Sequence, residues 1–318
     1  MDCLEENWLE LDWSPWVPFN AQREFWYIQK APGVYRIRPN NKDLLMYIGE
    51  TGQSLHKKLA GLRQTLRRGD LMPWSDPYAE APALWCWWVE WLSSQEKEKE
   101  PQVSSTVEWL SGQEEEKADE PEPVMLEVSS APLDASVSGR KGMENFLLYT
   151  YRQETGASPL CNFGRFHPRY RKSTTRSEGR RGGKLADDQK DNPAGFPSIT
   201  PLEPAGMPGD SDWMGLEWTE KKSLTPEYAR EVGEGAGLYL LADTGTQDIL
   251  SIGQSADIAG RLTGLCGKDW QGHEVQFSYQ IIGQNVLPHN LKELEADLLG
   301  NYYGNFRKMP AFQFQKSR

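Results

Sequence analysis

The sequence is poor in cysteine and histidine, and it lacks long apolar runs. Its 318 residues include four cysteines and four histidines, with no paired CxxC spacing. That scarcity argues against a structural zinc site and a disulfide framework, and it favours a reducing, cytoplasmic setting. The longest apolar run, around residues 83 to 89, is far too short to span a bilayer. The acidic N-terminus lacks the basic start of a signal peptide, so we expect no signal peptide and no membrane association.

Positive charge is also scarce, except in one segment. There are 35 Lys and Arg residues against 46 Asp and Glu, a formal net charge of -11, so the whole chain has no nucleic-acid footprint. The exception runs from 165 to 184 and holds a single acid, Glu178. Its cations are Arg165, Arg169, Arg171, Lys172, Arg176, Arg180, Arg181 and Lys184. Such a basic arm suits contacts to a nucleic-acid backbone, and a solvated linker is the alternative.

A strongly acidic segment precedes this arm. Between Glu96 and Glu122 there are ten acidic residues and three lysines, and the pentapeptide VEWLS at 89–93 recurs at 107–111. This composition cannot bury enough apolar surface to offset chain entropy. We therefore expect a disordered acidic insertion at about 93–123, between two strands. Its charge suggests that it occupies the basic arm when no DNA is bound.

Two stretches of the chain share their internal spacing. Each has a glycine two residues before a tyrosine, Tyr35 or Tyr239, and each has an Ile-Gly pair that follows about a dozen residues later. A glutamate further on, Glu144 or Glu295, lies fifteen residues before a proline in both stretches. Shared spacings of this kind predict an internal duplication, which also agrees with the length of the chain.

The apolar patterns predict the elements of each copy. In the first copy we expect a hairpin of strands at 33–38 and 44–48, a basic helix with leucines at 55, 59, 62 and 66, strands at 85–91 and 124–128, and a helix at 142–152. In the second copy we expect strands at 238–241, 249–252 and 275–282, with helices at 256–265 and from His289 onward. The predicted domains are 1–170 and 213–318, joined by a basic and then Pro/Gly-rich linker at 171–212.

The order of these elements and motifs resembles the GIY-YIG nuclease superfamily. The segments Gly33-Val34-Tyr35 and Tyr47-Ile48-Gly49 stand where that family has its naming motifs. The resemblance implies an α+β fold of two tandem domains, each a small three-stranded antiparallel sheet flanked by helices. It also implies cleavage of phosphodiester bonds in DNA with a divalent metal, Mg²⁺ or Mn²⁺.

The resemblance assigns roles to particular residues of the first copy. Tyr35 and Tyr47 match the two motif tyrosines, and in that family a tyrosine helps deprotonate the attacking water. Glu144 matches the metal-binding glutamate, and Asn162 matches a supporting asparagine. The position of a phosphate-binding arginine falls on Lys58. Lysine supplies charge without the bidentate fork of arginine, so either Lys58 acts on the phosphate or it acts on a tyrosine while Arg63 takes the phosphate.

The second copy departs from the family pattern elsewhere. Tyr239, Arg261 and Glu295 match the tyrosine, the arginine and the glutamate. Ser251 stands in place of the second tyrosine, and Gln313 stands in place of the asparagine.

These residues predict a metal-dependent DNA endonuclease whose first domain is catalytic. The second domain is a degenerate or weakly active copy used for DNA binding or for intramolecular pairing with the first. Arg165, Arg169, Arg171 and Lys172 are the expected nucleic-acid contacts. The alternative is a non-catalytic DNA-binding or scaffold protein in which both copies have decayed.

Overall fold

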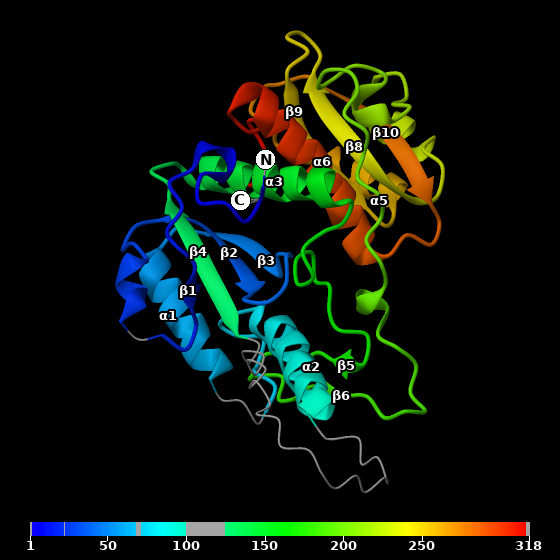
Figure 1. Ribbon diagram of the computed structural model, residues 1–318. Coiled ribbons are helices and arrows are strands. Elements are labelled where there is room, and N and C mark those ends of the chain that lie inside the picture. Colours follow the sequence, from blue (N-terminus) through cyan, green and yellow to red (C-terminus); the bar gives the residue numbers. More distant parts are fainter. Residues whose placement is uncertain (1, 22, 68–70, 100–124, 316–318) are drawn as a thin grey trace, which may run out of the picture.

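The computed structural model describes residues 2–21, 23–67, 71–99 and 125–315. Helices and antiparallel sheets are combined in an α+β architecture, as expected (Figure 1). No helix in these ranges is both long enough and apolar enough to cross a bilayer. The expected acidic insertion lies mostly at 100–124, outside the described residues.

The first sheet contains the predicted hairpin and two further strands. Its strands are β1 (Val17–Pro18), β2 (Gly33–Pro39), β3 (Tyr47–Thr51) and β4 (Leu126–Pro132), in the order β1-β4-β2-β3. Every pairing is antiparallel, and Tyr35 of β2 lies opposite Gly49 of β3. The two-residue strand β1 thus adds to the three-stranded sheet that the resemblance implies. β3 is left at the edge of the sheet.

Helices cover both faces of this sheet. They are α1 (Leu55–Leu66), α2 (Ala81–Lys99) and α3 (Val137–Thr155). Neighbouring residues of a strand face opposite ways, so Tyr35 packs in the core formed with α1 and α2, whereas Val34 packs in the core formed with α3. The four leucines of α1 are buried at the predicted spacing.

The strand prediction for residues 85–91 is wrong, because these residues form the middle of α2. A continuous apolar run does not distinguish a strand from a buried helix by periodicity. Length decides here, since the helix spans 19 residues and continues through the start of the expected insertion as far as Lys99.

The second sheet repeats this order. Its strands are β7 (Lys222–Ser223), β8 (Ala236–Asp243), β9 (Ile249–Ser255) and β10 (Val275–Gly283), in the order β7-β10-β8-β9. Its helices are α4 (Pro226–Arg230), α5 (Ile258–Leu265) and α6 (Pro288–Phe306). Tyr239 lies opposite Gly253, which is the same register as Tyr35 opposite Gly49.

A tryptophan pair precedes each sheet with the same geometry. Short 3₁₀ turns, η1 (Trp8–Glu10) and η4 (Trp213–Gly215), begin with the first tryptophan of each pair. The indole N–H of Trp13 donates to the carbonyl of Trp8 at 3.0 Å, and Trp218 donates to Trp213 at 3.0 Å. Both ring pairs stack with centroids 6.1 Å apart. The second tryptophan of each pair lies in a similar tetrapeptide, LDWS at 11–14 and LEWT at 216–219, so similar sequences form similar anchors.

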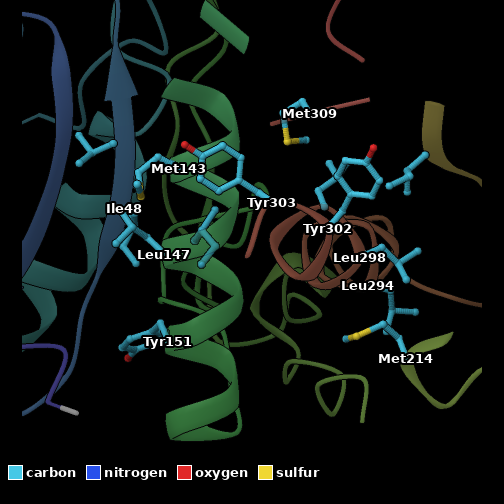
Figure 2. Close-up of a cluster of buried hydrophobic side chains, with 14 of the residues drawn as sticks. Ile48, Met143, Leu147, Tyr151, Met214, Leu294, Leu298, Tyr302, Tyr303 and Met309 are labelled. Atoms are coloured by element: carbon cyan, nitrogen blue, oxygen red, sulfur yellow. The ribbon is translucent and has the colours of Figure 1, made fainter. Parts of the chain in front are cut away.

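Helices α3 and α6 form the main contact between the two halves of the chain (Figures 1 and 2). Glycines allow their close approach. A Cβ atom on Gly142 would lie 2.3 Å from the Tyr303 ring, and one on Gly300 would lie 2.2 Å from the Cβ of Tyr149. Apolar side chains of both helices, including Leu147, join one buried cluster.

A fully buried ion network extends this contact. Arg152 of α3 donates from Nε to Asp297 of α6 at 2.7 Å and lies 3.7 Å from Glu293. All three side chains are inaccessible to solvent. The same carboxylates accept backbone N–H groups of Ile199 and Leu202. The predicted linker at 171–212 is therefore held against both helices over part of its length.

The basic arm forms a short hairpin. Its strands are β5 (Tyr170–Arg171) and β6 (Gly183–Lys184), and the turn η3 (Pro193–Gly195) follows. Tyr170 donates to Glu90 of α2 at 2.7 Å, and Lys184 pairs with the same carboxylate at 2.5 Å. An acid of α2 thus engages one cation of the arm.

Candidate functional site

A pocket of about 290 Å³ opens beside the edge strand β3. Helix α3 lies on one side of it and the start of α2 on the other. Its lining includes Tyr47, Glu80, Ala83, Glu144, Asn145, Leu148, Cys161, Asn162, Phe163, Arg165 and Lys172. Of the residues predicted from the sequence, Tyr47, Glu144, Asn162, Arg165 and Lys172 therefore meet at one place.

The two motif tyrosines lie together across the hairpin, and Gly49 makes room for them. Their ring centroids are 5.9 Å apart. A Cβ atom on Gly49 would lie 2.7 Å from the Tyr47 ring and 2.8 Å from the Tyr35 hydroxyl. A side chain at this position would displace both rings. The final glycine of the motif is thus explained by close packing.

The tyrosines differ in their access to the pocket. Tyr47 lines it, whereas Tyr35 is 1 % exposed and lies behind it. Burial, followed by the neighbouring Tyr47 and Glu80, raises the pKa of the Tyr35 phenol well above its ordinary value of 10. Burial and the charge of Glu80 also raise the pKa of Tyr47. Both groups are therefore neutral phenols at pH 7.

Glu80 connects the predicted cation to the predicted tyrosine. The Tyr35 hydroxyl donates to its Oε1 at 3.2 Å, and Lys58 Nζ lies 2.7 Å from the same oxygen. The Glu80 side chain is 4 % exposed and that of Lys58 is 21 % exposed. The sequence leaves two roles open for Lys58, binding the phosphate or acting on a tyrosine. The geometry favours the second, in which Lys58 acts on Tyr35 through Glu80.

Sequence reasoning missed Glu80. It lies 45 residues from Tyr35, directly before α2, in a segment without a motif or a repeat counterpart. The only signal in the sequence is that a lysine on a helix packed against the sheet needs a carboxylate partner, and the sequence offers many carboxylates.

Glu144 presents a carboxyl group to the pocket from α3. Burial, followed by the negative charge of Glu50, raises its pKa to about 8. The Glu80 charge adds to this effect, while Lys141 and a hydrogen bond with the backbone of Glu50 oppose it. Glu144 is therefore a group whose ionised form would gain strongly from a cation.

Asn162 fixes the edge of β3. Its side-chain oxygen accepts the Ile48 N–H at 2.9 Å, and its amide donates to the Ile48 carbonyl at 2.7 Å. In the second half, Gln313 accepts the N–H of Ile252 at 3.0 Å. Asn162 and Gln313 each lie eighteen residues after the glutamate of their half, and in both halves this spacing places an amide that supports the second strand of the hairpin.

Arg63, the other phosphate candidate, lies away from the pocket. It donates to the carbonyl of Ala21 at 2.5 Å and covers the ring of Phe25 at 4.2 Å.

The cations of the basic arm have different surroundings. Arg165 and Lys172 both line the pocket. Arg165 donates to the Ser158 carbonyl at 2.8 Å, and burial lowers the pKa of Lys172. Arg169 is paired with Asp191 at 2.8 Å, and Arg171 is exposed on the hairpin.

The second half assembles its own trio. Arg261 Nε donates to the Tyr239 hydroxyl at 3.2 Å, a contact for which Lys58 and Tyr35 have no direct counterpart. Burial raises the pKa of Glu295 to about 7, and Arg261 and Lys292 oppose this effect. A Cβ atom on Gly253 would lie 2.4 Å from the Tyr239 hydroxyl, as at Gly49.

A divalent metal would depend on few protein ligands at the pocket. Across the described part of the chain, no group of three or more His, Cys, Asp or Glu side chains is arranged to hold a metal ion. Mg²⁺ is commonly bound through one or two carboxylates, with waters and substrate phosphates completing its shell. The partly buried Glu144, whose pKa is raised and which lines the pocket, fits that pattern.

Comparison with known proteins gives no relative. No protein-family model, no curated protein and no solved structure matches the chain.

Proposed function

We propose that the chain is a divalent-metal-dependent endonuclease that hydrolyses phosphodiester bonds in DNA, with its active site in the pocket beside β3. The observation that supports this proposal is the meeting of Tyr47, Glu144 and the Lys58–Glu80 pair at one edge of a sheet. On this proposal the two halves are tandem GIY-YIG-like domains, and the first is the catalytic one.

Glu144 would hold the metal. A bound Mg²⁺ supplies positive charge to the phosphate and lowers the pKa of a coordinated water. Glu144 is then ionised, because a nearby cation favours the charged form of a carboxyl group. Lys172 and Arg165 add positive charge to the pocket wall and would attract the phosphate.

Tyr47 and Glu80 are the hydrogen-bond donor and acceptor groups that the pocket wall offers to the substrate and the attacking water. The Tyr47 phenol is neutral and would donate a hydrogen bond to a phosphate oxygen or to the attacking water. Glu80 faces the same pocket while it accepts the Tyr35 hydroxyl. Tyr35 thus acts through Glu80, because its own hydroxyl does not reach the pocket surface.

The second half serves as a structural partner of the first. Its α6 packs against α3, the helix that carries Glu144, and so fixes the back of the pocket. Because its second tyrosine position is Ser251, it lacks the phenol that Tyr47 places on the pocket wall.

Plasmid nicking with Mg²⁺ or Mn²⁺ tests the proposal. We expect Glu144→Gln to abolish nicking, while Glu295→Gln, its counterpart in the second half, leaves nicking intact. Glu295→Ala combined with Arg261→Ala should also leave it intact. Protein that shifts DNA but never cuts it with either metal would instead favour a non-catalytic DNA-binding or scaffold protein. Loss of nicking in Glu295→Gln alone would move the active site to the second half.

A further inference from the structure

A pair of aromatic side chains stands exposed beside helix α1. The turn η2 (Glu24–Tyr27) presents Trp26 with 71 % of its surface exposed and Tyr27 with 40 % exposed. Their rings stack on each other, with centroids 4.0 Å apart and planes at 28°. The two rings are therefore already ordered against each other, and each keeps one outer face that the other does not cover.

This turn is fixed by its other residues. Phe25 and Ile28 are buried in the core with α1, at 3 % and 1 % exposure. The backbone carbonyl of Gln29 accepts the N–H of His56 in the first turn of α1 at 3.0 Å. The fold thus holds the turn without using Trp26 or Tyr27. Adjoining exposed apolar groups mark candidate binding surfaces, whereas apolar side chains exposed singly are ordinary.

The hollow beside the aromatic pair is basic. Its volume is about 600 Å³, and Arg23, Lys30 and His56 lie among its lining residues, which include no acid. Glu24 is exposed on the same turn and is the nearest opposing charge in sequence. Positive groups around an aromatic face are the combination that binds single-stranded nucleic acid, because bases stack on the rings while cations meet the backbone.

His56 and Lys58 lie on opposite flanks of α1, and Glu80, the partner of Lys58, lines the candidate active site. His56 faces the hollow and contacts the Phe25 ring, whereas Lys58 faces Glu80. Lys57 stands exposed between them. An extended strand that leaves the pocket across the first turns of α1 would therefore meet cations along its path before it reaches the aromatic pair.

We propose that Trp26 and Tyr27 form a stacking platform for unpaired bases, so that the substrate is DNA with a single-stranded segment next to the cleaved bond. This inference rests on the proposed function for its connection to cleavage. The platform itself is tested by binding alone.

The experiment compares binding of a labelled thymidylate oligomer of about 20 nucleotides with binding of a duplex. We expect Trp26→Ala with Tyr27→Ala to weaken binding of the oligomer by roughly 10-fold to 100-fold and to weaken binding of the duplex by less than about 3-fold, because stacking needs an accessible base face. The matched control is Tyr228→Ala with Phe306→Ala, which removes two aromatics exposed to 42 % and 43 % elsewhere. It should leave both affinities unchanged.

Equal binding of the oligomer by the wild type and the platform variant would overturn the inference, as would an equal loss in the control. A second variant, Arg23→Glu with Lys30→Glu, keeps the rings and should flatten the salt dependence of oligomer binding; an unchanged dependence would also overturn it. Nicking by the wild type separates the two proposals. A nicking enzyme with an inert platform refutes only the platform, and platform-dependent binding without metal-dependent nicking refutes only the nuclease.

Discussion

Glu144→Gln should make the protein more stable while it removes activity. The fold raises the pKa of this carboxyl from an ordinary value of 4.5 to about 8. Between these two pH values the folded state keeps a proton that the unfolded chain releases. Wild-type stability should therefore fall as the pH rises from 4.5 to 8. Each pKa unit corresponds to about 1.4 kcal/mol, so the cost is about 3 kcal/mol at pH 7 and at most about 5 kcal/mol above pH 8. Glutamine is neutral throughout and avoids this cost.

Urea unfolding of both proteins between pH 5 and pH 8 measures the effect. The difference in unfolding free energy should be small at pH 5 and should grow in favour of the variant up to pH 8. Glu217→Gln, at an exposed acid, is the control and should run parallel to the wild type. Mg²⁺ at pH 8 should stabilise the wild type more than the Glu144 variant, because the cation favours the ionised carboxylate. A difference that stays constant across this pH range would refute the reasoning.

Three further predictions concern the packing and charges described above. Gly49→Ala should cost about 1–3 kcal/mol in urea unfolding, because the new methyl group overlaps both tyrosine rings; a neutral effect would contradict the close-packing explanation. Glu80→Gln removes a like charge that raises the pKa of Glu144, so the acid limb of the pH–rate profile for nicking should move to lower pH, and an unmoved limb would count against the coupling. Arg152→Met should cost about 3–5 kcal/mol, because it strands two buried carboxylates. As the comparison, Arg169→Met breaks the partly exposed pair with Asp191 and should change the unfolding free energy by less than about 1 kcal/mol.

The sequence was most informative where spacing encodes a local rule. The leucines of α1 were found by their helical period, and the glycine and tyrosine of each hairpin follow from a cross-strand contact that fixes their separation. The distance from Glu144 to Asn162 was also meaningful, because it runs from the helix α3 to the amide that supports β3. Regular local geometry therefore appears in the sequence as a period or a fixed spacing.

Contacts between distant segments left no such trace. Glu80 was missed because its partners lie on β2 and α1, at separations that no motif records. Arg63 was offered for the phosphate because it lies on the same helix as Lys58, yet it packs on Phe25 instead. The composition of residues 85–91 predicts a strand, whereas the helix that they form, and its partial burial, depend on packing across the whole fold. The role of Glu80, the position of Arg63 and the conformation of residues 85–91 all depend on residues that meet only in the folded protein.

The packing of α3 on α6 has the form of a two-fold contact inside one chain. Both helices span 19 residues, and an offset of 151 relates Glu144 to Glu295. By the same offset Gly142 corresponds to Glu293, and Arg152 corresponds to Tyr303. The contact between Gly142 and Tyr303 on one side therefore corresponds to the ion pair between Glu293 and Arg152 on the other. In a symmetric homodimer each residue change would appear on both sides of the axis.

Covalent connection removes that restriction. One side of the axis uses a glycine against an aromatic ring, and the other uses buried charges, a combination that identical subunits cannot hold. It also makes the association unimolecular, so it does not weaken on dilution. The chain therefore keeps the geometry of a dimer while each half is free to specialise.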